Sequence, residues 1–245
     1  MKENCTYLYE LGKWLGDRRG YPRVGIVNTE MTLIEDTKRF LEEHFHRTPL
    51  FQVITQKERP TMLGKKAYDI FIVDGRLHRH LEEDADNLIY GKLTAEQSLA
   101  LLAGLTDADG TIDLKNRQVV ISVGKKNHYI KEYVIRLTSL LAWPLRVWDC
   151  GKEWKLSIPL DSSVTSALLS CLRHPRKRAL LYGEVSCSDQ VYLDYIIRMG
   201  KIKSQDLVEQ FHIHADSARR LLRYFVAVGK LRLLSRKRPY IYVPK

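Results

Sequence analysis

The residues best suited to chemistry are two aspartates, each at the end of an apolar segment with helical character. Asp17 directly follows the segment Tyr7–Gly16, and Asp109 directly follows the segment Glu96–Ala108. A carboxylate at the C-terminus of a helix opposes the helix dipole at a cost of about 0.3–1 kcal/mol, and two such ends brought together also repel each other. A bound divalent cation relieves that repulsion, and carboxylate oxygens are ligands that Mg²⁺ accepts. We therefore predict that Asp17 and Asp109 are catalytic residues that bind Mg²⁺, for which Mn²⁺ or Ca²⁺ can substitute in binding.

Small residues spaced four apart in the same two segments indicate that these helices lie against each other. Gly12 and Gly16 occupy the first segment, and Gly104 and Ala108 occupy equivalent positions 92 residues further along the chain. Residues four apart lie on one helix face, and small side chains there allow two backbones to approach closely. Glycine costs a helix interior about 1 kcal/mol relative to alanine, so its use there indicates a steric need. The pattern predicts a helix–helix seam that brings the two aspartates side by side.

The charge of the chain predicts a polyanionic partner. The chain has 40 Lys and Arg against 29 Asp and Glu, a net charge of +11, and residues 176–245 alone contain 15 basic and 6 acidic side chains. Such an excess is typical of proteins that bind nucleic acid, although a basic face that serves only solubility is the alternative. No apolar run is long enough to span a membrane, and the first residues lack the apolar core of a secretory signal. We expect a cytoplasmic, nucleoid-associated protein whose four scattered cysteines form neither a zinc site nor a disulfide framework.

The order of apolar and polar segments repeats once, which indicates two related half-domains. Each half reads αββαββ, so the predicted class is α+β with two related antiparallel sheets. The main elements of the first half are predicted at Tyr7–Gly16, Arg23–Val27, Leu33–Phe45, Leu50–Ile54, Ala67–Val73 and Leu77–Asn87. Those of the second half are predicted at Glu96–Ala108, Gln118–Val123, Tyr129–Leu141, Leu145–Trp148 and Glu153–Ile158.

A nine-residue motif lies at the end of the first helix of the second half. Residues 102–110 read Leu-Ala-Gly-Leu-Thr-Asp-Ala-Asp-Gly, which resembles the signature of the LAGLIDADG homing endonucleases and differs from it only at Thr106. The first half carries a weaker counterpart, Leu11-Gly12-Lys13-Trp14-Leu15-Gly16-Asp17-Arg18, in which Arg18 stands where the family usually has glycine. The resemblance covers residues 1–175. It implies two pseudo-symmetric LAGLIDADG half-domains, residues 1–92 and 93–175, each with a saddle-like sheet.

The resemblance implies a monomeric, single-chain enzyme that binds double-stranded DNA through both sheets and cuts both strands by Mg²⁺-dependent phosphodiester hydrolysis. A metal ion between the two aspartates would activate water and polarise the phosphate. Basic side chains on and around the strands are the candidates for DNA contacts: Arg18, Arg19, Arg23, Lys66, Lys125, Lys126, Arg146, Lys152 and Lys155. The family often places a lysine near the active site, and Lys66, Lys152 and Lys155 all stay open as that lysine.

Residues 176–245 resemble a winged helix-turn-helix DNA-binding domain. The run Arg176-Lys177-Arg178 after Pro175 is expected to be a linker. Helices are predicted over Tyr192–Arg198, Ser204–Phe211 and Ala215–Val228, and strands over Lys230–Leu234 and Pro239–Val243. The recognition helix then presents Arg219, Arg220 and Arg223, and the wing tip carries Arg236, Lys237 and Arg238. A helical protein-interaction module is the alternative for this segment.

The function implied by the resemblance has two alternatives. A transcriptional regulator that kept the scaffold for DNA binding and lost cleavage agrees with the irregular first motif, and RNA maturases also occur in the family. For Asp109, the alternative to a metal ligand is a turn residue before a left-handed Gly110. Asp107 and Asp113 are expected to face solvent or to cap turns. Site-specific DNA cleavage is the leading interpretation because Asp109 and Asp17 are both present.

Overall fold

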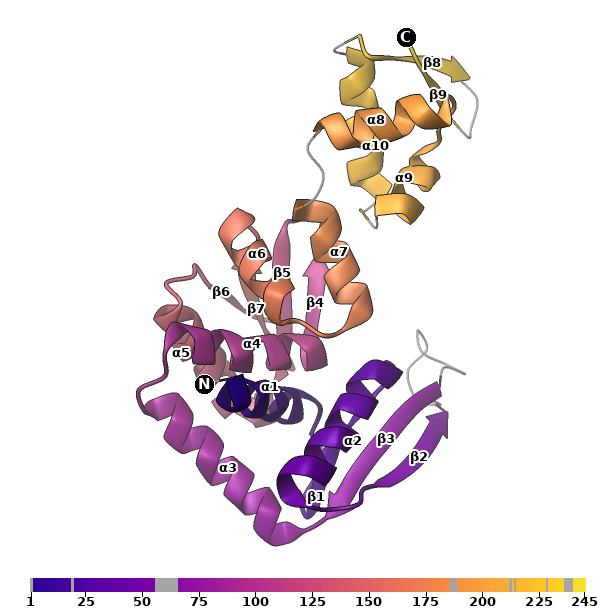
Figure 1. Cartoon of the computed structure of the whole chain (residues 1–245). Helices are drawn as coiled ribbons and strands as arrows, with labels where there is room; N and C mark the ends of the chain where they lie inside the picture. Colours follow the sequence, from indigo (N-terminus) through magenta and orange to yellow (C-terminus); the bar gives the residue numbers. More distant parts are fainter. Residues whose placement is uncertain are drawn as a thin grey trace. The chain divides into compact units, whose positions relative to one another are not determined.

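The computed structural model describes residues 2–18, 20–55, 66–185, 189–211, 213, 215–227, 229–235 and 240–245 (Figure 1). The chain divides into two compact units. One contains residues 1–111, 119–159 and 170–175, and the other contains residues 112–118, 160–169 and 176–245. None of the described helices is long and apolar enough to cross a membrane.

The first half is built on a three-stranded antiparallel sheet. Its elements are α1 (Lys2–Asp17), β1 (Arg23–Asn28), α2 (Met31–Phe45), β2 (Leu50–Thr55), β3 (Lys66–Val73) and α3 (Gly75–Tyr90). The strands lie in the order β1-β3-β2, with Ile26 of β1 opposite Ile70 of β3. These two side chains pack with Leu33 and Ile34, so α2 covers that face of the sheet (Figure 1).

The second half is built on a four-stranded sheet in the order β4-β5-β7-β6. Its elements are α4 (Ala95–Asp109), β4 (Gly110–Asp113), β5 (Gln118–Gly124), α5 (His128–Leu140), β6 (Arg146–Asp149), β7 (Glu153–Pro159) and α6 (Ser162–Cys171). Helix α4 begins with a capping box, in which Thr94 Oγ1 accepts from the backbone N–H of Gln97 at 3.2 Å and Gln97 Oε1 accepts from the N–H of Thr94 at 2.9 Å. This cap fixes where the motif-bearing helix starts.

The structure confirms the α+β class with antiparallel sheets, but the two halves are not equal. The second half has the predicted αββαββ order, whereas the first strand of the first half is reduced to an isolated bridge between Arg18 and Ile26. Only residues 18–22 separate α1 from β1, while residues 110–117 separate α4 from β5. The shorter segment lacks the length for both a strand and its turn. Pro22 also has no N–H to donate to a ladder.

The chain continues into a helical segment and a small C-terminal sheet. The elements are α7 (Pro175–Val185), α8 (Asp189–Met199), α9 (Ser204–Phe211), α10 (Ala215–Ala227), β8 (Leu231–Ser235) and β9 (Ile241–Pro244). Helices α8 to α10 share one apolar core with this hairpin, to which Ile196, Leu207, Leu222 and Tyr242 contribute. These three helices and the hairpin share one core, and the winged helix stays a prediction for this segment.

The prediction of a linker at Arg176-Lys177-Arg178 is wrong, because these residues form the first turn of α7. Pro175 occupies the first position of that helix, where its fixed φ is compatible with helical geometry and its missing N–H costs nothing. The residues that follow include Ala179, Leu180 and Leu181, which favour helix. A run of basic residues is therefore not by itself a sign of a linker.

Candidate functional site

The first helices of the two halves, α1 and α4, are in backbone contact. A Cβ atom added at Gly104 would lie 2.7 Å from the backbone nitrogen of Lys13, and one added at Gly16 would lie 2.5 Å from the Cβ of Ala108. A Cβ at Gly12 would collide with the backbone of α4. Larger side chains at these glycines would push the helices apart, so the small residues allow the close approach.

The seam brings the C-terminal ends of both helices together. A Cβ at Gly16, the residue before Asp17, would lie 3.6 Å from the backbone nitrogen of Asp109. Asp17 is half-buried, and its Oδ2 accepts a hydrogen bond from Nδ2 of Asn28 at 2.6 Å. Asp109 is exposed at the end of α4. Sequence reasoning missed Asn28, whose only signal is its position at the end of a predicted strand.

The oxygen atoms at these helix ends fit a hard divalent cation. Mg²⁺ takes an octahedral shell of oxygen ligands and commonly keeps waters beside one or two carboxylates and substrate phosphates. Among the residues that the structure describes, no group of three or more His, Cys, Asp or Glu side chains is arranged to hold a metal ion. A cation held by Asp17 and Asp109 therefore needs further ligands from water and phosphate.

Gly110 does not adopt the left-handed conformation that the turn-residue alternative for Asp109 requires. Its φ of −79° and ψ of 150° are extended, and its N–H donates to the carbonyl oxygen of Thr106. A Cβ at Gly110 would lie 2.5 Å from that same oxygen. The glycine is needed for close packing on the last turn of α4, so the left-handed cap is wrong.

Arg18, a predicted DNA contact, is bonded within the protein. Its Nη1 lies 2.6 Å from Oε1 of Glu82 in α3, and its Nη2 donates to the hydroxyl of Tyr129 in α5. The guanidinium carbon also lies 4.9 Å from the ring centroid of Tyr129 and 5.5 Å from that of Trp14. Arg18, which follows the first aspartate, therefore joins the end of α1 to α3 and α5.

Asp107, expected to face solvent or cap a turn, is instead fully buried. Its Oδ2 accepts hydrogen bonds from the hydroxyl of Tyr9 at 2.5 Å and from the backbone N–H groups of Arg173 and His174 at 2.6 and 3.1 Å. The expectation failed because those donors lie 98, 66 and 67 residues away in sequence. Asp113 does cap a turn, since its carboxylate accepts from the backbone and side chain of Asn116.

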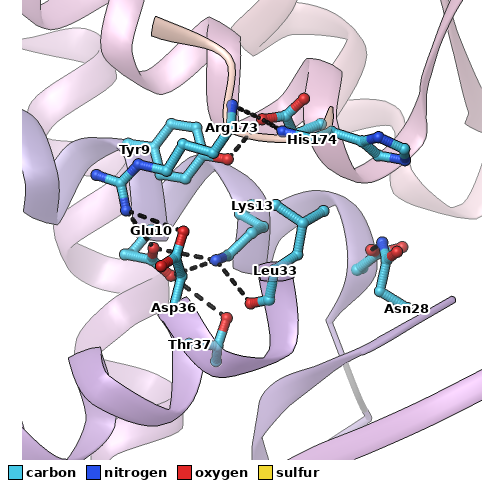
Figure 2. A network of polar contacts seen from close by, with 11 residues as sticks. Tyr9, Glu10, Lys13, Asn28, Leu33, Asp36, Thr37, Arg173 and His174 are labelled. Atoms are coloured by element: carbon cyan, nitrogen blue, oxygen red, sulfur yellow. Dashed lines mark hydrogen bonds and ion pairs between the residues drawn. The ribbon is translucent and has the colours of Figure 1, made fainter. Parts of the chain in front are cut away.

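A buried polar network lies beside the seam and includes residues that sequence reasoning missed (Figure 2). Lys13 is fully buried, with Nζ 2.8 Å from Oε2 of Glu10 and 3.1 Å from the carbonyl oxygen of Leu33. Nη1 of Arg173 lies 3.2 Å from Oε1 of Glu10 and 3.5 Å from Oδ2 of Asp36. The network therefore connects α1, α2 and the segment between α6 and α7.

Burial shifts the pKa of several groups in this network. It raises the pKa of the Glu10 carboxyl, against the attraction of Lys13 and Arg173, and lowers the pKa of the Lys13 ammonium, against the attraction of Glu10. Burial, followed by the Asp107 carboxylate, raises the pKa of the Tyr9 hydroxyl well above its ordinary value. The network thus keeps the Tyr9 proton in place as a hydrogen-bond donor.

In the first half, Arg23 lies on the sheet face opposite α2. It alternates along β1 with Ile26, whose side chain packs under α2, and its guanidinium carbon lies 4.6 Å from the ring centroid of Phe71. Lys66 is exposed at the start of β3. Arg19 lies outside the described residues.

In the second half, the sheet face away from α5 presents Lys155 and Trp148, which are cross-strand neighbours. The opposite face holds Trp154, because Lys131 of α5 lies 4.9 Å from its ring centroid. Lys125 turns to that side, where it pairs with Asp149 and lies 4.3 Å from the Trp154 centroid. The other side chains of this half that were predicted to contact DNA are exposed: Lys126, Arg146 and Lys152.

The C-terminal arginines are exposed on one helix. Arg219, Arg220 and Arg223 project from α10, and Arg219 pairs with Asp216 at 2.8 Å. The predicted wing-tip residues lie outside the described residues: Arg236, Lys237 and Arg238.

Comparison with solved structures identifies the fold. No protein-family model matches the chain, and no curated protein matches it in sequence. A structure of I-DmoI in complex with DNA and Ca is 19% identical, with a TM-score of 0.53, and the match covers 72% of this chain and 96% of that one. Variants of the homing endonuclease I-DmoI match with 18% identity and a TM-score of 0.51, over 69% of this chain and 98% of theirs.

Full-length DUF199/WhiA from Thermatoga maritima is 9% identical, with a TM-score of 0.50, and the match covers 92% of this chain and 91% of that one. All of these identities are low, so the likeness concerns the fold. The chain has a LAGLIDADG-like fold.

Proposed function

We propose that the chain is a site-specific endonuclease that cuts double-stranded DNA with the help of Mg²⁺. The observation that carries the proposal is the meeting of Asp17 and Asp109 at the ends of two helices whose backbones touch. Two carboxylates at adjoining helix C-termini are electrostatically unfavourable without a cation, which makes a purely structural role a poor explanation. The fold it shares with a homing endonuclease supports the same proposal.

The residues of the chain have distinct tasks in this proposal. Asp17 and Asp109 hold the cation, and Asn28 orients the Asp17 carboxylate through its 2.6 Å hydrogen bond. Bound Mg²⁺ supplies an activated water and a polarised phosphate. Arg23 and Lys155, each on the sheet face away from the helix that covers its half, contact the DNA, and the seam fixes the spacing of the two aspartates.

We also propose that residues 1–92 and 93–175 are the two half-domains and that residues 176–245 form a winged helix. In this arrangement α10 is the recognition helix. Arg220 and Arg223 are exposed on it, and exposed arginines suit phosphate and base contacts. Exposed basic residues on a compact module make it a second DNA-binding surface of the same monomer.

The test is incubation of the full chain with Mg²⁺ and a plasmid that contains the DNA flanking its own gene. The proposal expects a linear product from supercoiled plasmid, and none in the presence of a chelator. A chain that binds this DNA tightly but never cuts it, in Mg²⁺ or Mn²⁺, contradicts the proposal.

A DNA-binding regulator without cleavage is the second candidate. It is favoured by Arg18, which occupies the position after the first aspartate and is fixed by Glu82 and Tyr129. The motif of the first half therefore ends in Asp17-Arg18, where that of the second half ends in Asp109-Gly110. A regulator of this kind should bind its site in Mg²⁺ and in Ca²⁺ alike and cut it in neither.

A further inference from the structure

The segment between α6 and α7 is attached to both halves at the seam. The backbone N–H groups of Arg173 and His174 donate to Oδ2 of Asp107 in α4, and the hydroxyl of Tyr9 in α1 donates to the same oxygen. A buried carboxylate needs such donors because an unsatisfied charge in the interior is costly. One oxygen of α4 therefore holds α1 and this segment together.

The side chain of Arg173 contacts two helices of the first half, α1 and α2 (Figure 2). Its guanidinium pairs with Glu10 of α1 at 3.2 Å and with Asp36 of α2 at 3.5 Å, and its central carbon lies 4.2 Å from the ring centroid of Tyr9. Glu10 is almost fully buried, and Arg173 is one-third exposed. A planar guanidinium offers donors in a fixed geometry, so it restrains both helices at once.

Three of the contacted residues, Tyr9, Glu10 and Asp107, lie on the two helices that carry the aspartates. Asp107 precedes Asp109 by two residues in α4, and Tyr9 and Glu10 precede Asp17 in the same unbroken helix α1. A helix is rigid over this length, so a rotation of α1 at Glu10 moves its far end. The seam glycines set how closely the helices approach, but glycines have no side chains that resist such a rotation.

We propose that Arg173 is a positioning residue that fixes the orientation of α1 relative to α4 and thereby the separation of Asp17 and Asp109. The consequence for catalysis rests on the proposed endonuclease function, whereas the consequence for helix orientation does not. Arg173 lies beyond the last predicted strand of the second half and outside the motif, so neither motif spacing nor charge pattern assigns it this role.

The orientation is measured in the full chain, free of DNA and metal, by the distance distribution between spin labels introduced as unnatural amino acids at Glu35 and Ser139. These two exposed positions lie on α2, which Lys13 and Arg173 join to the network on α1, and on α5, which follows α4 in the second half. Arg173→Ala should broaden or shift the distribution, and Asp36→Asn, which removes the outer ion pair only, should change it less. Arg79→Ala removes one exposed charge from α3 and serves as the matched control, which should keep the wild-type distribution.

The catalytic consequence is measured by cleavage of a verified site. A displacement of about 1 Å at a reacting group can cost roughly 100-fold in rate, so Arg173→Ala should lower kcat by about 10- to 100-fold with KM and Ca²⁺-supported DNA binding unchanged. Arg173→Lys, which keeps the charge, should recover part of kcat. Arg79→Ala should cut at the wild-type rate.

The outcomes separate the two proposals. If the wild type cuts no DNA but Arg173→Ala shifts the label distances, the endonuclease fails and the orienting role of Arg173 stands. Unchanged distances in Arg173→Ala overturn that role. A wild-type kcat in a variant with shifted distances overturns the claim that Arg173 sets the separation of Asp17 and Asp109. Should Arg173→Ala not fold, Asp36→Asn decides by the same two measurements, and wild-type distances and kcat in that variant overturn the proposal.

Discussion

The backbone of Gly104 in α4 lies directly against the backbone of Tyr9 in α1, because a Cβ at Gly104 would collide with the carbonyl oxygen of Tyr9. The hydroxyl of the same Tyr9 donates a hydrogen bond to Asp107, less than one turn further along α4. Backbone contact and a buried hydrogen bond thus join the two helices at one place. The aspartates that end both helices owe their proximity to this contact.

Replacing Gly104 with alanine should destabilise the protein. The added methyl group meets backbone atoms of α1, which cannot rotate away, and overpacking of this kind costs about 1–3 kcal/mol. Denaturant unfolding measures the change. Gly124→Ala is the matched control, since a Cβ there meets nothing within 4 Å, and its effect should stay within about 0.5 kcal/mol. Equal unfolding midpoints for the two variants would show that the helices are not in contact.

The stability of the protein should fall as the pH rises above about 10. Tyr9 keeps its proton in the folded state, because burial and Asp107 raise the pKa of its hydroxyl, but it loses that proton in the unfolded chain near the ordinary tyrosine pKa of about 10. The folded state then binds more protons than the unfolded state, so the free energy of unfolding decreases with increasing pH. Below that range the contribution of Tyr9 is fully present.

Tyr9→Phe tests whether Tyr9 causes this loss of stability at high pH. The variant should be less stable at neutral pH, because Asp107 loses a hydrogen-bond donor. Above pH 10 its free energy of unfolding should fall less steeply than that of the wild type, and the two slopes should differ by up to about 1.4 kcal/mol per pH unit. Unfolding curves between about pH 7 and 11 give the comparison, with Tyr224→Phe, which removes an exposed hydroxyl, expected to follow the wild type. A Tyr9→Phe curve parallel to that of the wild type would refute the assignment.

The motif was sufficient to predict the seam and the fold because its signal is local. Helix periodicity alone places small residues four apart on one helix face, with the aspartate at the end of the same helix. The role of Asp107 could not be predicted, because its donors come from Tyr9 and from residues 173 and 174, which only the folded chain brings together. Lys13 is only a letter of the first motif, and nothing in the local sequence indicates that its ammonium group lies in the core.

Removing charge from α10 should weaken DNA binding without changing its sequence preference if these side chains bind phosphates. Arg220→Gln combined with Arg223→Gln should reduce the slope of log K against log salt by about 0.9 for each phosphate that is no longer neutralised. Binding titrations at several salt concentrations measure the slope. Arg79→Gln, a change of the same charge on α3, should leave it unchanged. An unaltered slope in the double variant would assign the exposed face of α10 to a protein partner instead.

The most direct measurement of the central claim is DNA cleavage by the wild type and by Asp109→Asn on a verified binding site in Mg²⁺. The substitution keeps the shape of the side chain and removes the charge that binds the cation. Cleavage should be abolished while DNA binding in Ca²⁺ persists, and Glu35→Gln, which removes an exposed carboxylate from α2, should cut like the wild type. Wild-type protein that cuts nothing, or Asp109→Asn that cuts at the wild-type rate, would contradict the claim that Asp17 and Asp109 form a metal-dependent DNA cleavage site.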